Sequence, residues 1–548
     1  MAHPIDIPEI LALILESAAP RPEYVEHCPP QHAILRERTR KLYRFALVSR
    51  SWNTVATPLL WEILPHHLPV LKLLPDDAWS MTPTSVVASF YDPEAANAFF
   101  NLPMLELFTL NRSLKQEDWR RIHRLSRYVK LMRYDGGLCA PSALSSMASS
   151  PPTDVLLPNL ERLQVTTETA STNSFLTFLL SPSIWDLQLR VQCEDMPNLL
   201  AITAHCPRLT HLLVSLPLIH SLNIDAAQEL GLKIIQIRSK HLTHLSLLIA
   251  GLDEAGMFVS VLGYSPSLTS LRLFLSFPVT RPPYEQLALT RAPQPLFVNL
   301  RTLHVNMMRP AFAQALIKSW GGPRPIESLS ITLTRFDTVD DMASLIETIA
   351  THCSPSTLIH LHALAGVSPD WPPVPWPFSY LRPLSEHRRL ETVRIGETKG
   401  ATQFSDADYG ELARWWPELV QLNVPNLTGW SCTLAALFHF ADNCPRLQKL
   451  NLKLNALEIP YFGGKKFSGN SALREIDIND GRIILPLDVA DCLSGAFPHL
   501  SKLRYRYEEE WDFLDDEDEA VTWKEESWKE VETYLAEFRD AREQRASG

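Results

Sequence analysis

A short leucine pattern recurs along most of the 548-residue chain and limits the architectures open to it. Around Leu447 the stretch NCPRLQKLNLKLNALEI fills the pattern L-x-x-L-x-L-x-x-N-x-L in full. The shorter core, L-x-x-L-x-L with aliphatic or aromatic substitution, begins again at Leu102, Leu160, Ile184, Leu209, Leu242, Leu268, Leu300, Ile326, Leu358, Leu390, Leu419, Leu473 and Leu500. Repetition of this kind predicts a repeat architecture rather than a single globular core.

Each copy of the pattern predicts one short strand followed by a helix. Leucines two positions apart point to the same side of a strand, and the residue between them faces the other side. Segments between copies, such as MASLIETIATHC and LAALFHFADNC, carry apolar residues three and four apart, as a helix does. Prolines in CPRL, WPEL and FPHL precede the strands and should end each helix there. The fold class predicted is an α/β solenoid with a strand and a helix per unit.

These copies resemble the leucine-rich repeat family, in its helix-rich ribonuclease-inhibitor-like form, over residues 102–507. The residues between the inward leucines should line the concave face of the solenoid, where repeat proteins bind their partners. They are mostly polar and of mixed charge, which is typical of protein recognition. We predict contacts with a protein substrate from Arg272, His304, Arg394, Asn423, Asn451, Asp477 and Arg504. Outward strand positions also carry His211, His244, His304 and His360.

Residues 1–64 carry a different pattern, which predicts a small helical module. The stretch LYRFALVSRSWNTVATPLLWEIL is apolar around more than half of a helix, so it must be covered on two sides. IDIPEILALILESA carries a dense apolar face that can cover one of them. Pro8 suits a first helical turn. Between the two stretches, residues 20–41 are proline-rich at their start and are predicted to form a loop insertion. Residues 65–101 are expected to connect the module to the solenoid.

The order IPEI, LVSRSW, ATPLLWEIL resembles the F-box, a three-helix module that binds the Skp-family adaptor of cullin-RING ubiquitin ligases. The resemblance implies a substrate-recognition subunit of a Skp-cullin-F-box ligase, with a protein substrate of unknown identity on the repeat arc. It also implies adaptor contacts from Pro8, Leu11, Ile14, Val48, Ser49, Trp52, Leu60 and Trp61. An alternative stays open: the module only caps the solenoid of a non-catalytic scaffold.

The net charge of −11 comes from the C-terminal tail. Residues 508–548 hold 16 acidic and 5 basic side chains, which leaves 46 of each in residues 1–507. A body without a basic face gives no reason to expect nucleic-acid binding. Within the tail, Trp528, Val531, Leu535 and Phe538 are spaced as the apolar stripe of an amphipathic helix, predicted to cover the last repeat.

The sequence contains no arrangement typical of catalysis or of metal or cofactor binding, so we expect neither an enzyme nor a cofactor. The eight cysteines are widely separated and are expected to be buried free thiols. GYSPS lacks the closing glycine of a nucleophile elbow, and GGKKFSG lacks the order of a phosphate loop. The N-terminus does not resemble a secretory signal and no apolar run is long enough for a membrane span, so we expect a cytoplasmic or nuclear protein.

Overall fold

The computed structural model describes residues 8–19, 32–83, 106–153, 155–167, 176–191, 202, 204–216, 241–250, 262–276, 295–333, 339–365, 377–397, 404–424, 432–452, 454–460, 472–478, 481–505 and 518–547. The chain divides into two compact units, Met1–Gly251 and Leu252–Gly548.

Unit 1 begins with three helices, α1 (Pro8–Ala18), α2 (His32–Ala46) and α3 (Arg50–Glu62). The prediction of a loop over residues 20–41 was wrong for its second part, because α2 already begins at His32. Leu35, Arg38 and Leu42 follow one another at spacings of three and four and are all buried, so this segment has a helical inner face. Residues 20–31 lie outside the described part of the chain.

A parallel sheet follows in unit 1, in the order β1-β4-β5-β6-β7-β8. Its strands are β1 (Ile63–Leu64), β4 (Leu131–Asp135), β5 (Arg162–Thr167), β6 (Asp186–Val191), β7 (His211–Leu216) and β8 (His244–Ala250). Leucines at matching positions, Leu163, Leu187, Leu212 and Leu245, pair in register across β5 to β8 and are buried. This is the repeat that the leucine spacing predicted.

The start of the sheet differs from the prediction. The copy at Leu102 was expected to open the solenoid, but residues Glu106–Leu110 form β3, which pairs antiparallel with β2 (Trp79–Pro83) in a separate small sheet. The Trp79 and Phe108 rings stack across these strands at 5.7 Å, which favours this pairing. The sheet instead begins at β1 and β4, two strands that the leucine pattern did not indicate. The remaining elements here are α4 (Leu68–Leu71), α6 (Gln116–Ser126), η2 (Gly136–Leu138) and α7 (Pro141–Ser149).

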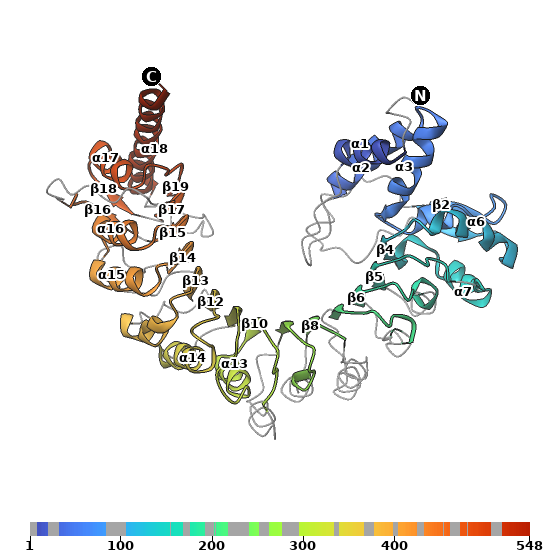
Figure 1. Ribbon diagram of the computed structural model, residues 1–548, viewed down its shortest axis with the longest axis horizontal. Coiled ribbons are helices and arrows are strands. Elements are labelled where there is room, and N and C mark those ends of the chain that lie inside the picture. The colour runs from blue at the N-terminus through green and yellow to red at the C-terminus, as the bar shows by residue number, and fades with distance from the viewer. Residues whose placement is uncertain are drawn as a thin grey trace. The chain divides into compact units, whose positions relative to one another are not determined.

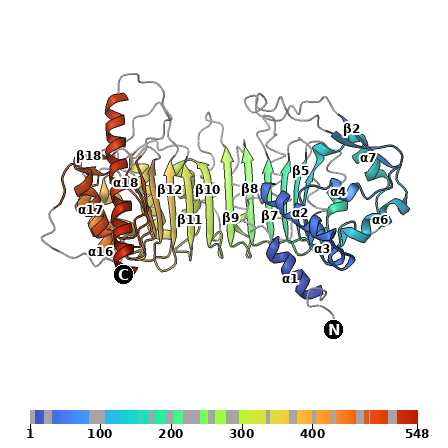
Figure 2. The ribbon, with the colours of Figure 1, turned by 90° about the horizontal axis from the view of Figure 1, so that it is seen from above.

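Unit 2 contains a second run of parallel strands, in the order β9-β10-β11-β12-β13-β14-β15-β17-β19. These strands are β9 (Ser270–Ser276), β10 (Thr302–Met308), β11 (Ser328–Leu333), β12 (His360–Ala365), β13 (Thr392–Glu397), β14 (Gln421–Asn423), β15 (Lys449–Asn451), β17 (Glu475–Asp477) and β19 (Lys502–Arg504). A two-stranded sheet joins β16 (Asn455–Ala456) to β18 (Arg482–Ile483). Figure 2 shows β9 to β12 side by side.

The described helices between these strands pack on one side of the sheet of unit 2 (Figure 1). They are α13 (Pro310–Lys318), α14 (Val339–His352), η3 (Phe378–Glu386), α15 (Asp406–Trp415), α16 (Leu434–Asn443) and α17 (Pro486–Ala496). α15, α16 and α17 each end two residues before a proline, Pro417, Pro445 and Pro498 respectively, as the sequence predicted. The predicted α/β repeat fold, with one strand and one helix in each repeat, is thereby confirmed.

Side chains along the strands of unit 2 alternate between a buried face and an open face. In β11 the residues Leu329, Ile331 and Leu333 are buried under the helices, whereas Ser328, Ser330 and Thr332 are half-exposed. We call the side of the sheet away from the helices the open face. It corresponds to the concave face expected from the sequence.

The last described helix, α18 (Asp518–Ser547), packs on α17 and β18. Trp528, Val531 and Leu535 are buried, and the Trp528 indole donates a hydrogen bond to the carbonyl oxygen of Gly481 at 2.7 Å. The apolar stripe seen in the sequence thus faces the end of the repeats. Within the described residues, no helix is both long and apolar enough to span a bilayer.

Candidate functional site

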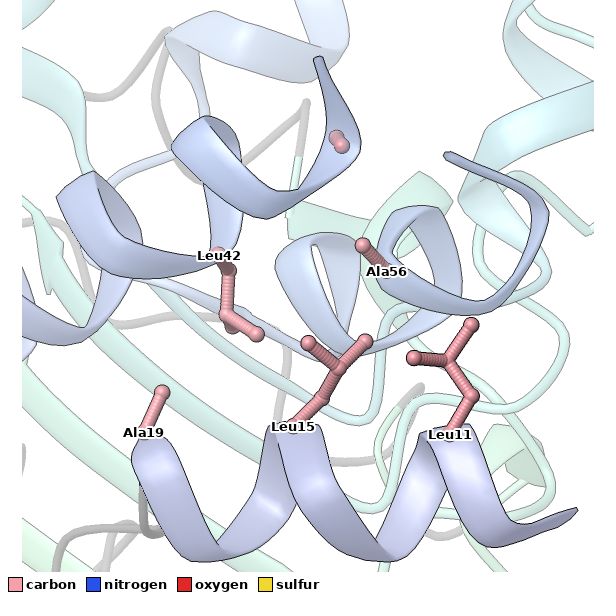
Figure 3. Packing of buried hydrophobic residues seen from close by; sticks show 6 residues of the cluster. Leu11, Leu15, Ala19, Leu42 and Ala56 are labelled. Atoms are coloured by element: carbon pink, nitrogen blue, oxygen red, sulfur yellow. The ribbon is translucent and has the colours of Figure 1, made fainter. Parts of the chain in front are cut away.

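The three N-terminal helices pack around a small apolar core. Leu11 and Leu15 of α1 point toward Leu42 of α2 and Ala56 of α3 (Figure 3). The Phe45 and Trp52 rings lie 5.6 Å apart and pack against this core. Residues 8–62 therefore contain a helical module with its own core, as the apolar girth of its helices predicted.

The opposite side of α1 exposes further apolar residues. Leu13 is 67% exposed, and Ile10 and Ile14 are both exposed as well. Leu11 and Leu15 lie four positions apart and share the inner face, so residues offset from them by one or two positions point outward. α1 therefore has more apolar side chains than the core of the module buries.

A second exposed apolar site lies at the turn between α2 and α3. Leu47 is 68% and Val48 61% exposed. The turn is fixed because the backbone NH of Leu47 donates to Arg44 O and Ser49 caps α3, accepting from the Trp52 backbone NH at 3.2 Å. Two residues of α2 are exposed and apolar as well. We use the name module surface for all the exposed large apolar residues of the module: Ile10, Leu13, Ile14, Ile34, Tyr43, Leu47 and Val48.

The predicted adaptor-contacting residues divide into three groups. Pro8, Ile14, Val48 and Ser49 are exposed. Trp52, Leu60 and Trp61 are half-buried, and the first two of these pack against the module core.

Leu11 is the exception, because it is only 1% exposed and belongs to the core. Its predicted place at a contact surface is corrected to a core position, and Leu13 faces outward instead. The sequence could not decide between them, because α1 is apolar nearly all round.

The end of α3 connects the module to the sheet of unit 1. Glu62 is buried and lies 3.4 Å from Arg38 Nη2 and 3.3 Å from Lys130 Nζ. Arg38 also donates a hydrogen bond to Leu59 O at 3.1 Å. Directly after Glu62, Ile63 pairs with Leu131 as the first strand pair of the parallel sheet. α3 therefore continues directly into the first strand of the sheet. The prediction that residues 65–101 connect the module to the solenoid was wrong, because the sheet already begins at Ile63.

The open face of unit 2 brings the predicted substrate-contacting residues to one level of the sheet. Arg272 pairs in register with His304, and Arg394 with Asn423. The row continues through Asn451, Asp477 and Arg504. These seven residues thus share a face, although what they bind stays a prediction.

Two further residues complete this row: Ser330, whose place on this face follows from the repeat pattern, and His362, which was not predicted. Ser330 pairs with His304 and with His362, and His362 pairs with Arg394. The signal for His362 was the weaker pattern copy LIHLHA, whose fifth position it occupies. The pKa of His362 is lowered to about 4 by burial, by the Arg394 charge and by His360, so its imidazole is neutral at neutral pH.

The C-terminal end of the same face holds a group of ion pairs. Glu475 lies 2.7 Å from Arg504 Nε, 3.3 Å from Lys502 Nζ and 3.5 Å from Lys449 Nζ. Burial acts to raise the pKa of Glu475, but the hydrogen bond from Lys502 and the charges of Arg504 and Lys449 lower it overall. The side chains of Lys449, Lys502 and Arg504 are therefore all paired with the Glu475 carboxylate.

In unit 1 two of the outward strand histidines stack on each other. The His211 and His244 rings lie 4.0 Å apart and 9° from parallel, and Trp185 meets His211 edge-on at 5.2 Å. The Thr210 and Thr243 hydroxyls lie 2.8 Å from the Nδ1 atoms of the neighbouring histidines. These contacts account for the orientation of both rings.

A cysteine and a histidine meet in the interior of unit 1, which the sequence did not show because they are far apart in the chain. His67 Nε2 lies 3.1 Å from Cys139 Sγ, and both side chains are buried. Burial raises the pKa of Cys139 to about 12, and burial together with His66 lowers the pKa of His67 to about 3. Both groups are neutral at neutral pH, whereas a nucleophilic cysteine requires the thiolate.

Metal ligands and cysteines are the remaining groups of chemical interest within the described ranges. No group of three His, Cys, Asp or Glu side chains there has the geometry to hold a metal ion. Six cysteines are described, all of them free thiols, and five of these are buried. Cys28 and Cys193 lie outside the described residues.

Comparisons with known proteins give fold similarities only. No family model and no curated protein matches the chain. Among solved structures, the yeast Rad7 and Elc1 complex matches at 13% identity over 68% of this chain and 85% of that one, with a TM-score of 0.33. The leucine-rich repeat-containing protein LegL7 of Legionella pneumophila matches at 13% identity over 73% and 98%, with a TM-score of 0.25.

The Drosophila Toll–Spatzle complex matches at 14% identity over 72% of this chain and 60% of that one, with a TM-score of 0.27. Similarities of this size do not bear on partner or substrate. The function of this chain is therefore inferred from its own residues.

Proposed function

We propose that this protein is a substrate-recognition subunit of a Skp-cullin-F-box ubiquitin ligase. In this role the N-terminal module binds a Skp-family adaptor, and through it a cullin-RING ligase, while the repeats bind a protein substrate. The single observation that carries the proposal is the module surface, on which Leu13, Leu47 and Val48 are each more than 60% exposed.

A module that only capped the repeats would not need such a surface. Terminal caps of repeat proteins cover the apolar end of the solenoid and turn a polar face to solvent. Here the core of the module is already filled by Leu11, Leu15 and Leu42, and further large apolar side chains remain outside. Exposed apolar residues that gather on one small module mark a binding surface for another protein.

The resemblance to the F-box identifies the partner proposed for the module surface, which is a Skp-family adaptor. The LVSRSW stretch contains the exposed Leu47 and Val48, the Ser49 cap and the half-buried Trp52 at one corner of the module. Since α3 runs directly into β1, an adaptor bound at this corner would be held at a fixed position relative to the strands of unit 1.

The proposed role requires no catalytic group in this chain. A substrate receptor contributes by holding substrate lysines near the conjugating enzyme, which raises their effective concentration. Accordingly we propose a non-enzymatic protein that acts without a cofactor, in the cytoplasm or nucleus.

The test is co-purification of the full chain with a Skp-family adaptor. Leu47→Asp with Val48→Asp places two charges on the module surface without touching the core. Ile484→Asp with Leu487→Asp is the matched control, because these residues are similarly exposed at the start of α17 in unit 2. We expect the parent and the control to retain the adaptor and the module variant to lose at least about tenfold in affinity, the size of a central interface contact.

Circular dichroism and thermal unfolding would verify that all three proteins are folded. A folded parent that does not bind the adaptor would contradict the proposal and leave the scaffold alternative. Equal loss in the module variant and the control would show that binding does not depend on the module surface.

A further inference from the structure

The open face of unit 2 contains a group of polar side chains on three neighbouring strands. His362 of β12 pairs in register with Arg394 of β13, which pairs with Asn423 of β14. All three side chains are half-exposed, so they are partly covered by their neighbours but accessible from the open face.

Arg394 has no counter-charge among the described residues. It forms no hydrogen bond or ion pair there, and its Nε is buried without a partner. The open-face positions on the two adjacent strands, β12 and β14, are His360, His362, Leu364, Gln421 and Asn423, none of which is acidic. Glu391, which precedes β13, pairs with Arg446 at 3.2 Å.

Its two neighbours in the row have unsatisfied polar atoms as well. Within the described structure, His362 Nε2 and Asn423 Oδ1 are buried and have no hydrogen-bond partner. A half-buried guanidinium without a carboxylate is costly, because its lost hydration is not replaced. The contrast with Lys449, Lys502 and Arg504, which surround Glu475, shows that cations elsewhere on this face are paired.

We infer that His362, Arg394 and Asn423 form an anion-binding site on the open face that takes a carboxylate or phosphate group from a segment of the protein substrate. The fork of an arginine guanidinium binds either anion through two parallel hydrogen bonds. The neutral His362 imidazole can donate a further hydrogen bond to the same oxygen atoms through Nε2, which has no partner among the described residues. On the other side of Arg394 the donor is the Nδ2 group of Asn423, because its unsatisfied Oδ1 is an acceptor and does not bind an anion. The inference rests on the proposed function only in calling the partner a substrate.

The experiment measures binding of the full chain to three peptide libraries. Each library consists of nine-residue peptides with a fixed central residue, which is glutamate, phosphoserine or glutamine. The variants are Arg394→Gln, which removes the charge, and Arg394→Lys, which keeps the charge but loses the fork. Arg414→Gln is the matched control, because Arg414 is exposed on α15 in the adjacent repeat, on the helix side of the sheet.

We expect the parent to prefer glutamate or phosphoserine over glutamine by at least tenfold. Arg394→Gln should abolish this preference, Arg394→Lys should reduce it, and Arg414→Gln should leave it unchanged. Stronger binding of phosphoserine would identify a phosphorylated segment, and equal binding of both anions an acidic one. A parent without preference for anions, or an Arg394→Gln variant that keeps the preference, would overturn the inference.

The folding of the variants separates a binding role from a structural one. Since Arg394 has no partner to lose, Arg394→Gln should melt at the same temperature as the parent or higher. Should that variant fail to fold, Arg394→Lys and His362→Gln carry the same test. Adaptor co-purification with Arg394→Gln should be unaffected, so failure of the anion site and failure of the ligase role can be told apart.

Discussion

Leu13 and Leu15, two positions apart on α1, contact different surroundings. Leu15 is fully buried against α2 and α3, whereas Leu13 is 67% exposed. We expect Leu15→Ala to lower the free energy of unfolding of the module by about 2–5 kcal/mol, because it leaves a cavity. The same change at Leu13 should stay within about 0.5 kcal/mol of the parent.

Urea denaturation followed by circular dichroism measures both values. Leu13→Ala should instead lower the affinity for the Skp-family adaptor, because Leu13 belongs to the module surface. Similar stability losses in the two variants would mean that Leu13 is covered as well, which would remove the basis for the module surface.

His67 should make the stability of unit 1 depend on pH. Its folded-state pKa is about 3, against an ordinary value of 6.5, because burial and His66 disfavour the charged ring. Below pH 6.5 the unfolded chain binds a proton that the folded chain does not, so the free energy of unfolding falls as pH decreases from about 6.5 toward 3. Between pH 7 and pH 5 this amounts to about 2 kcal/mol.

The measurement is urea denaturation at pH 7 and pH 5 for the parent, His67→Gln and His123→Gln. The pH-dependent loss should be about 2 kcal/mol smaller in His67→Gln. His123, which is half-exposed on α6, is the control and should change little. An unchanged loss in His67→Gln would show that the imidazole of His67 is not held neutral.

Among the elements, α18 depends on a few buried side chains for its position. Trp528 is fully buried, and its indole donates to Gly481 O at 2.7 Å. We expect Trp528→Ala to destabilise the docking of α18 by about 3–5 kcal/mol, since both the packing and the hydrogen bond are lost. Hydrogen exchange of the full chain should show faster exchange in α17, α18 and β18.

Lys529→Ala, at the adjacent exposed position, is the control and should leave the exchange unchanged. Protection of α17 that persists in Trp528→Ala would mean that α18 does not cover the end of the repeats. Exchange in β9 to β12 should not change in either variant, because elements of a repeat protein contact mainly their neighbours.

Strands β3 and β4 show where the local leucine pattern is insufficient to predict the strands of the parallel sheet. The copy at Leu102 has the right spacing, yet β3 pairs antiparallel with β2. Conversely, β4 has Met132 and Tyr134 where other strands have leucines, and both side chains are buried as leucines would be. Any large apolar side chain at these two positions can cover the helix side of the sheet, so the pattern identifies most strands without identifying all of them.

On the scale of the whole molecule, the two surfaces that the proposed function requires lie in different units. The module surface lies in unit 1, and the anion site lies on the open face of unit 2. A substrate receptor needs these two kinds of surface, one for the ligase and one for the substrate. Because their residues do not overlap, the adaptor and peptide experiments test them independently.

The sequence by itself determined the repeats, because a strand with buried leucines and the helix that covers it lie within one short segment. It also determined that α1 and α3 form an apolar module, and where prolines end α15 to α17. Only the tertiary structure decided that Leu11 is inside and Leu13 outside, and that His362, Arg394 and Asn423 lie side by side. The meeting of His67 with Cys139 is of the same kind. Such relations depend on the packing and register of segments far apart in the chain, which no local spacing specifies.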